Sequence, residues 1–570
     1  MCLIVYVGVY MADQSCSKIR TYKSTPTGIS RRDVLRAGAA LIPASIIVPA
    51  WLSANAATPN TTFDYYISPT GSDSNSGTLT APWAITSLSL FSHNAKNAAN
   101  CKLQAGKRIG FLPGTYDVSG MMFADSSSGA IQLIGGSSTA PTYWGSSNTS
   151  GQYSPRTATI TALGANGKYG GGVYEAPMVS HVGTYPVAYA TGYATIDGLR
   201  FTGFEYKGVR IGGASSGDGP SGIPGVIVQN CEFFGGGFNP GDGTDNCVAL
   251  WIDGTIGALI TNNWFHDTTG HTANSEDHLN AITVWGPTQG PATTTQGTVI
   301  TYNTVVNAGS VFGKEGGIQG STIAYNYIDV SAYTVAGGYG IEDFTGANTT
   351  GMTQTTTINN NIILMGNCVA IGQPTLSNSA GWSTPLTVYN NTIIGAIAAP
   401  VAAWVTEVAG SSGNGQLSWY NNIYDSGGHS GSFDNYGNYY LNPAGPKLWD
   451  YNLNPASGCT WTLYNNTGLS SALASFSSPS AFAAGLASKG GISGVEAHSI
   501  MGAPTYVKTG ADAAQYQLAA GSLGKGTGST NGTPSGSKTD MGAWGNGATQ
   551  VGCNLASGAE VPGTPRLTVS

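Results

Sequence analysis

Hydrophobic and polar residues recur in one order along the middle of the chain: two or three β-forming residues precede an Asn, and one or two apolar residues follow it. Apolar positions two residues apart, such as Val226 and Val228, have the periodicity of strands rather than of helices. Each copy therefore predicts a β-strand that ends in a turn. The asparagines of the seven copies are Asn230, Asn263, Asn303, Asn326, Asn361, Asn391 and Asn422.

The spacing of these asparagines predicts a solenoid. They follow one another after 33, 40, 23, 35, 30 and 31 residues, so the repeat has a short minimum length and is extended by insertions in its loops. In stacked coils each Asn lies over the previous one, and the amides can hydrogen-bond along the axis at the strand spacing of about 4.8 Å. We therefore interpret the asparagines as structural rather than catalytic.

The recurrent Asn turn resembles the turns of right-handed parallel β-helix proteins of the pectate-lyase-like superfamily, which are secreted and act on polysaccharides. Further phrases that resemble this superfamily lie at 63–90, 110–118, 448–453, 496–500, 516–518 and 540–544. The resemblance implies an all-β fold, a single-stranded right-handed parallel β-helix with an Asn ladder, an N-terminal cap and an irregular C-terminal segment. His498 and Asp540, in the C-terminal phrases, are expected to be structural.

The N-terminal residues resemble a twin-arginine export signal. Arg31 and Arg32 precede an apolar run at 37–52, and small residues at 54–56 suit cleavage. We therefore expect an exported protein, periplasmic or extracellular, with no membrane span once the signal is removed. The expected division of the chain is 1–56 signal peptide, 57–109 N-terminal strand and cap, 110–430 parallel β-helix, and 431–570 C-terminal coils and irregular tail.

Composition and charge limit the classes of partner that the protein can bind. Only 9% of residues are charged, with 22 Lys and Arg against 29 Asp and Glu. Residues 1–56 hold 6 of the basic and 2 of the acidic residues, so the rest of the chain has 16 against 27 and a net charge of −11. Nucleic acid is therefore an unsuitable partner. We expect a monomer that binds a polysaccharide, and Cys459 with Cys553 as a candidate disulfide.

A second strand precedes the Asn strand in each coil, and in the superfamily that this chain resembles the polysaccharide usually lies across the sheet that these strands form. Alternation assigns Leu250, Ile282 and Ile341 to the inside. Aromatic rings on the outside can stack on sugars; the alternative is that loops cover the tryptophans. The outward set is Arg210, Trp251, Asp253, Thr283, Trp285, Lys314, Glu342 and Trp404, of which Arg210, Trp251, Trp285 and Trp404 are the candidate substrate-binding residues.

A pair of aspartates lies upstream of two of these strands. Asp245 and Asp277 each precede the aligned positions Leu250 and Ile282 by five residues, so we expect the carboxylates to stack one coil apart, near His278. Two such carboxylates can form an acid/base pair or, with Asp253, a Ca²⁺ site. The alternative is that they are solvated turn residues. The surrounding stretch 266–278 is the densest ionisable patch of the sequence.

Lys314 is the candidate base. Uronide lyases of the fold that this chain resembles abstract the C5 proton of the sugar with a Lys or Arg, while Ca²⁺ or a basic group neutralises the carboxylate. The first hypothesis is a lyase that acts by β-elimination on a uronic-acid-containing glycan. The alternatives are a glycoside hydrolase with two carboxylates from Asp245, Asp277, Glu342 and Asp343, and a non-catalytic carbohydrate-binding or surface protein. Lys314 would then only pair with Glu342 or Asp343.

Overall fold

The computed structural model describes one part of the chain, and the predicted signal peptide lies outside it. The described residues belong to one compact unit, Ile46–Ser570, and no helix among them has the length and hydrophobicity of a membrane span. They are 62–89, 91–92, 95–96, 101–102, 104–121, 130–162, 177–182, 192–204, 207–212, 223–236, 247–268, 279–285, 297–314, 318, 320–331, 339–344, 355–365, 369–372, 385–395, 401–404, 417–427, 433–440, 448–456, 459–464, 472–490, 493–508, 512–529, 538–545, 548 and 550–553; for some strand residues only the backbone is described.

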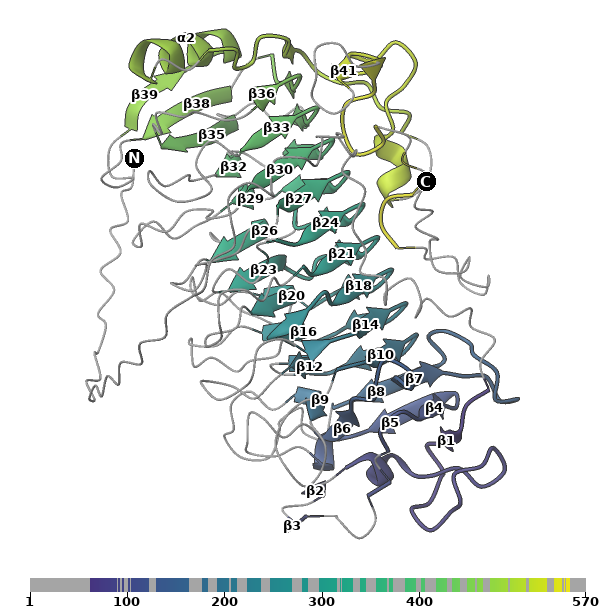
Figure 1. Ribbon diagram of the computed structural model, residues 1–570. Coiled ribbons are helices and arrows are strands. Elements are labelled where there is room, and N and C mark those ends of the chain that lie inside the picture. Colours follow the sequence, from purple (N-terminus) through teal and green to yellow (C-terminus); the bar gives the residue numbers. More distant parts are fainter. Residues whose placement is uncertain are drawn as a thin grey trace, which may run out of the picture. The chain divides into compact units, whose positions relative to one another are not determined.

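Three parallel sheets make up this unit, with 12, 12 and 9 described strands (Figure 1). The first sheet consists of β1 (Tyr65–Ile67), β4 (Arg108–Phe111), β7 (Thr142–Ser146), β10 (Ala194–Asp197), β14 (Val226–Gln229), β18 (Leu259–Thr261), β21 (Val299–Thr301), β24 (Thr322–Ala324), β27 (Thr356–Asn359), β30 (Leu386–Tyr389), β33 (Ser418–Tyr420) and β36 (Leu448–Asp450).

The second sheet consists of β5 (Gly114–Asp117), β8 (Ala158–Thr161), β11 (Arg200–Thr202), β15 (Glu232–Phe234), β19 (Trp264–His266), β22 (Thr304–Val306), β25 (Tyr327–Asp329), β28 (Ile362–Met365), β31 (Thr392–Gly395), β34 (Ile423–Asp425), β37 (Leu453–Asn454) and β40 (Ile500–Met501). The third sheet consists of β6 (Ile131–Ile134), β9 (Pro177–Val182), β12 (Lys207–Gly212), β16 (Cys247–Asp253), β20 (Leu279–Trp285), β23 (Ser310–Lys314), β26 (Tyr339–Phe344), β29 (Val369–Gly372) and β32 (Val401–Trp404).

Shorter elements flank these sheets: β2 (Phe91–Ser92), β3 (Ala95–Lys96), β13 (Ile223–Pro224), β17 (Thr255–Ile256), β35 (Phe433–Tyr440), β38 (Cys459–Tyr464), β39 (Ala472–Phe476), β41 (Gly528–Ser529), β42 (Lys538–Thr539), the 3-10 helices η1 (Ile85–Leu88), η2 (Ser119–Met121) and η3 (Asp512–Tyr516), and the α-helix α2 (Pro479–Gly490). The first and second sheets continue past residue 430, because β36, β37 and β40 extend them.

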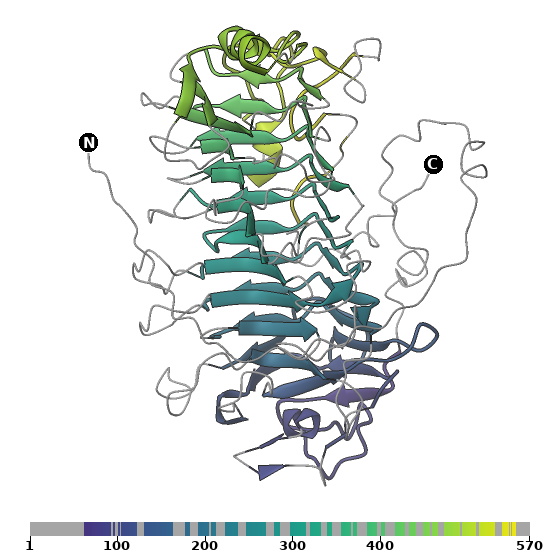
Figure 2. The ribbon, with the colours of Figure 1, turned by 60° about the vertical axis from the view of Figure 1, so that its left-hand side comes forward.

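From β4 to β32 the coils visit the three sheets in the same order. Figure 2 shows the strands of these coils stacked on one another. In one coil β16 lies in the third sheet, β18 in the first and β19 in the second, and β20 then returns to the third. All neighbouring strands within the three sheets are parallel, as in the pairs β16 with β20 and β18 with β21. The chain is therefore a right-handed parallel β-helix, as the sequence pattern predicts.

One continuous hydrophobic core fills the space between the sheets. The second sheet contributes Phe201, Phe233 and Phe265, whose rings stack at centroid distances of 4.9 and 4.8 Å. Trp83 and the η1 residue Leu88 belong to the core at its N-terminal end, and Phe482 of α2 belongs to it at its C-terminal end. Because these residues cover the ends of the stack, the terminal coils do not expose core side chains there.

An amide ladder connects successive turns between the first and second sheets. The Nδ2 group of Asn303 donates to Oδ1 of Asn326 at 3.1 Å, and Nδ2 of Asn326 donates to Oδ1 of Asn361 at 2.9 Å. Each Oδ1 also accepts the backbone N–H of the previous Asn, as between Asn326 N and Asn361 Oδ1 at 3.0 Å. The complete ladder is Asn263, Asn303, Asn326, Asn361, Asn391, Asn422 and Asn452.

The prediction that Asn230 belongs to the ladder is wrong by one position. Cys231 occupies the ladder site, and its backbone N–H donates to Oδ1 of Asn263 at 2.9 Å. Asn230 instead has a φ of 57° and corresponds to Asn262, which has a φ of 54°. Several coils end in two adjacent asparagines, of which the first adopts the left-handed conformation and the second enters the ladder; a coil with a single Asn leaves this choice open to sequence reasoning.

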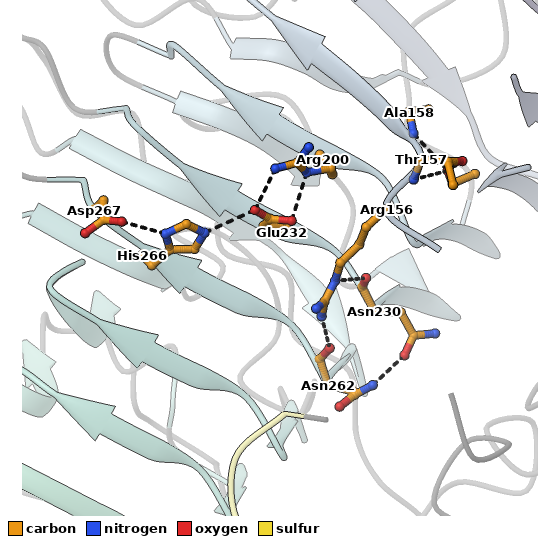
Figure 3. Close-up of polar contacts among 10 residues, drawn as sticks. Arg156, Thr157, Ala158, Arg200, Asn230, Glu232, Asn262, His266 and Asp267 are labelled. Atoms are coloured by element: carbon orange, nitrogen blue, oxygen red, sulfur yellow. Dashed lines mark hydrogen bonds and ion pairs between the residues drawn. The ribbon is translucent and has the colours of Figure 1, made fainter. Parts of the chain in front are cut away.

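A buried carboxyl anchors the residues beside the first of these turns. Asp197 accepts hydrogen bonds from Tyr143 Oη at 2.9 Å and Asn230 Nδ2 at 2.7 Å, and burial raises the pKa of this carboxyl. Figure 3 shows Arg156 nearby, with its Nε donating to the carbonyl oxygen of Asn230 at 3.1 Å. The guanidinium thereby holds a loop from an earlier coil against the start of the ladder.

The C-terminal segment, defined here as residues 512–553, packs along the outward side of the second sheet. Its contacts move back along the stack: Gly542 N donates to Asn421 O at 2.8 Å, and Cys553 N donates to Thr304 Oγ1 at 2.8 Å. Cys553 is a free thiol, so the predicted disulfide with Cys459 is wrong. Leu518, Met541 and Ala543 of this segment pack in one cluster with outward residues of the sheet, which are Tyr327, Ile362, Leu364, Ile394, Ile423 and Leu453.

Candidate functional site

The outward side of the third sheet carries the predicted site residues in two columns, each formed by partners in successive strands. The first outward column is Arg210, Trp251, Thr283, Phe312, Glu342, Gly372 and Trp404. The second outward column is Gly212, Asp253, Trp285, Lys314 and Phe344. The alternating residues Leu250, Ile282 and Ile341 belong to the core, and the pairing of Leu250 with Ile282 confirms the predicted register.

Trp251 is covered rather than exposed. The side chain is 5% exposed, Lys207 Nζ lies 4.3 Å from the centroid of its ring, and the ring of Trp285 lies at 5.0 Å, tilted by 47°. Cation–π and aromatic contacts of this kind fix the orientation of a tryptophan. Trp285 is partly exposed, so it is the more accessible of these two predicted sugar-contacting rings.

Two charged residues of the first outward column are buried. Arg210 is 8% exposed and Glu342 is 0% exposed. Charged groups at such positions require polar or charged partners, since removal from water is costly. The carboxyl of Glu342 is therefore out of contact with solvent in this structure.

The backbone register ranks the remaining candidates in this sheet. Lys314 is the partner of Trp285 in the previous strand and of Phe344 in the next. Asp343 is the partner of Gly313, in the column that contains the core residue Val284. The register therefore favours Glu342 over Asp343 as the outward carboxylate of β26.

Several predicted site residues cannot be compared with the structure. Asp245, Asp277 and His278 lie outside the described residues. Only the backbone is described for Asp253, Lys314, Asp343 and Trp404. Across the described part of the chain, no group of three or more His, Cys, Asp and Glu side chains could hold one metal ion. The predicted stacking of the two aspartates and the Ca²⁺ site thus stay predictions.

A network of charged side chains on the second sheet was not predicted. Arg200 donates twice to Glu232, from Nε at 2.9 Å and Nη2 at 3.0 Å. His266 Nε2 lies 3.2 Å from Glu232 Oε1, and His266 Nδ1 lies 2.8 Å from Asp267 Oδ2. Figure 3 shows these side chains in a row across β11, β15 and β19. We call this set the charged network.

Hydrogen bonding sets the protonation of the two acids in the charged network. Burial alone would raise the pKa of Glu232, but the hydrogen bonds from His266 and Arg200 and the charge of Arg200 outweigh it and lower the pKa to about 2. The hydrogen bond with His266 likewise lowers the pKa of Asp267. Both groups are therefore carboxylates at neutral pH.

Aromatic rings accompany the charged network. His266 stacks on Trp264 at a centroid distance of 3.8 Å and on Phe234 at 5.4 Å, and the guanidinium carbon of Arg200 lies 4.8 Å from the centroid of Phe234. The signal in the sequence is the alternation of these residues with core Phe233 and Phe265. His266 is the first residue of the ionisable stretch 266–278 and the last residue of β19.

Three further acids lie in the C-terminal phrases. Trp449 Nε1 donates to Glu496 Oε1 at 2.7 Å, and burial raises the pKa of Glu496 to about 7. Asp450 Oδ2 lies 2.6 Å from His498 Nδ1. Asp540 pairs with Lys525 Nζ at 2.8 Å. These contacts join the C-terminal segments to each other and to the last coils, in keeping with the structural roles expected for His498 and Asp540.

No family model matches the sequence, and no curated protein matches it. Among solved structures the chain is similar to pectate lyase Pel9A, with 16% identity and a TM-score of 0.39 over 84% of this chain and 95% of that one. It is also similar to a rhamnogalacturonan lyase (12%, TM-score 0.35, 64% and 83%) and to XylC in complex with xylose (11%, TM-score 0.31, 64% and 76%). The fold assignment itself rests on the strand order and register.

Proposed function

We propose that the protein is an exported polysaccharide lyase, which cleaves a uronic-acid-containing glycan by β-elimination. The observation that supports this best is the second outward column, in which Asp253, Trp285 and Lys314 are partners in three successive strands. At a strand spacing of about 4.8 Å, the backbones of Asp253 and Lys314 are about 10 Å apart, with Trp285 between them. The proposal places a sugar on the accessible Trp285 ring, with Asp253 and Lys314 as the partners of Trp285 in the two neighbouring strands.

In the proposed reaction the neutral amine of Lys314 takes the C5 proton of the uronic acid. The electron pair of the C5–H bond forms a C4=C5 double bond, the C4–O bond breaks, and the departing oxygen gains a proton to become the new chain end. A positioned base of this type contributes about a hundredfold or more to the rate. The amine must first lose its own proton, which nearby positive charge favours.

Ca²⁺ is the proposed cofactor. Asp245, Asp253 and Asp277 would hold it, since carboxylate oxygens are the ligands that this cation prefers. The bound ion would neutralise the carboxylate of the uronic acid and so make the C5 proton more acidic. Chelation should then lower turnover and the melting temperature, and Asp277→Asn should reduce that sensitivity; indifference to chelator in both assays would contradict the metal site.

A polysaccharide panel tests the reaction class. The protein is incubated with uronic-acid and neutral glycans, and both the ultraviolet absorbance of unsaturated products and the reducing ends are recorded. A lyase yields both signals. Reducing ends without absorbance would indicate a glycoside hydrolase instead, and neither signal across the panel would indicate a carbohydrate-binding protein.

Lys314→Ala tests the base. We expect turnover to fall by at least about a hundredfold while oligosaccharide binding persists. Lys525→Ala is the matched control, because Lys525 pairs with Asp540 in the C-terminal segment. The lyase assignment is wrong if Lys314→Ala keeps near-normal turnover. It is also wrong if the products are saturated and only Glu342→Gln is inactive; a hydrolase is then the better assignment.

A further inference from the structure

The outward side of the second sheet changes character beyond β22, which contacts the last described residue, Cys553. From the C-terminal coils back to β22, the described C-terminal segment covers the sheet. Its last contact is the hydrogen bond from Cys553 N to Thr304 Oγ1 of β22. The preceding strands β5, β8, β11, β15 and β19 continue with the same parallel register. We call their outward side the open face. Its two columns are Thr115, Thr159, Arg200, Glu232 and Trp264, and Asp117, Thr161, Thr202, Phe234 and His266.

The open face presents hydroxyls and aromatic rings to solvent, and Glu232 of the charged network lies largely buried among them at 5% exposure. Thr115 and Asp117 are exposed, and Phe234 and Trp264 are partly exposed. Partly exposed aromatic rings beside fixed polar groups are the usual means by which proteins contact sugars. Five strands at about 4.8 Å span roughly 20 Å, which is long enough for a short stretch of a glycan chain.

The charge of the open face selects among glycans. In the charged network the guanidinium of Arg200 and the imidazole of His266 face the carboxylates of Glu232 and Asp267, so the basic side chains do not outnumber the acidic ones. Asp117 adds an exposed carboxylate. The open face therefore offers no excess positive charge to a polyanion such as a polyuronate. Its polar groups are held in place before any ligand arrives, which favours hydrogen bonds to uncharged hydroxyls.

We propose that the open face is a second carbohydrate-binding site, which holds a neutral polysaccharide chain across β11, β15 and β19 through Trp264, Phe234 and the charged network. This inference takes its ligand class from the proposed function but does not depend on Lys314 as a base. A site of this kind would keep the protein on a mixed glycan matrix while the third sheet acts on uronic-acid segments.

Two single variants test this site separately from the proposed active site. Binding is measured by retardation in native gels that contain galactan, glucomannan, mixed-linkage β-glucan or polygalacturonate, and turnover is measured on soluble uronic-acid oligosaccharides. Trp264→Ala should weaken binding to at least one neutral glycan by about tenfold with unchanged turnover. Trp285→Ala should lower turnover of the uronic-acid oligosaccharides and leave binding to the neutral glycans unchanged.

Trp264→Phe controls for a loss of structure, because it keeps a ring on His266; it should restore most of the binding, and the melting temperatures of the variants are recorded. The proposal is wrong if the wild type binds none of the three neutral glycans, or if Trp264→Ala binds them as well as the wild type. It is also wrong if Trp264→Ala loses only polygalacturonate binding. Failure of turnover in the wild type, with Trp264-dependent binding intact, would overturn the proposed function alone.

Discussion

The second sheet has two regions that share strand spacing and register but differ on the outward side. From β22 to β37 the C-terminal segment covers the sheet, and the outward residues are largely apolar, as at Tyr327, Ile362 and Leu453. From β11 to β19 the described residues leave the sheet open, and the same columns carry Arg200, Glu232 and His266. The chemical character of the outward residues of this sheet therefore follows what covers them, while the inward residues are hydrophobic in both regions.

The outward side chains of the two regions also contribute differently to the stability of the fold. In the covered region apolar side chains are removed from water and stabilise the fold in proportion to the buried area. In the open region the network of hydrogen bonds satisfies the charges, and it contributes less because water still competes with its more exposed members. Stability should therefore respond to mutation much more strongly in the covered region.

The largest effect is expected for Ile362→Ala. Ile362 is 0% exposed beneath the C-terminal segment, so truncation leaves a cavity and should lower the free energy of unfolding by about 2–4 kcal/mol. Thr202→Ala, on the open face, is the matched control and should change it by about 0.5 kcal/mol or less. Urea unfolding measures both; equal effects would remove the contrast between the regions.

Glu496→Gln sharpens the comparison through pH. The pKa of this buried acid is raised to about 7 from 4.5, so the folded state holds the proton more tightly than the unfolded state. The stability from this group is fully present below about pH 4.5 and is lost as pH rises through about 7, by up to about 3 kcal/mol. Melting temperatures across this range should fall in the wild type and fall less in Glu496→Gln; parallel curves would refute the shift.

Glu232→Gln tests the opposite sign. The pKa of Glu232 is lowered to about 2 from 4.5, so its contribution is present above about pH 4.5 and is lost as pH falls toward 2. Because Arg200 is 33% exposed, we expect a loss of only about 1–2 kcal/mol in the wild type. The urea midpoint of the wild type should fall between about pH 4.5 and pH 2, and that of Glu232→Gln should change less over the same range. Asp117→Asn, an exposed acid of the same sheet, should retain the wild-type acid sensitivity.

The smallest effect is expected for Lys525→Ala. Its ion pair with Asp540 is on the C-terminal segment, where the two side chains are 41% and 31% exposed. Such pairs contribute less than about 1 kcal/mol, and salt weakens them further. Urea unfolding at low and high salt checks this value. A loss as large as that of Ile362→Ala would mean that this ion pair, rather than apolar burial, holds the segment in place.

The sequence predicted the repeating framework because alternation and the turn asparagines are local signals. Asn326 and Leu250 lie where the pattern assigned them. The charged network escaped prediction because Arg200 and Glu232 are 32 residues apart, and Glu232 and His266 are 34 apart, in coils whose lengths vary by insertion. Only the register of the second sheet shows that these residues are neighbours.

The candidate site was predictable to a lesser degree. Alternation identified the outward sides of β16, β20 and β23, but it could not show that Lys207 would cover Trp251. Lys207 lies on the previous strand, and its contact depends on how long side chains of adjacent coils bend over the sheet. Burial of Glu342 likewise depends on what folds over the sheet and not on the alternation within a strand.

The asparagine ladder has a direction. Each member before Asn452 gives both its backbone N–H and its Nδ2–H to a single oxygen of the coil that follows, as Asn326 does to Asn361. A partly assembled stack therefore ends, on its C-terminal side, in two donors aimed at a coil that has not yet formed, whereas its N-terminal side ends in an acceptor. The paired donors of one coil and the single acceptor of the next thus fix both the position and the alignment of successive turns.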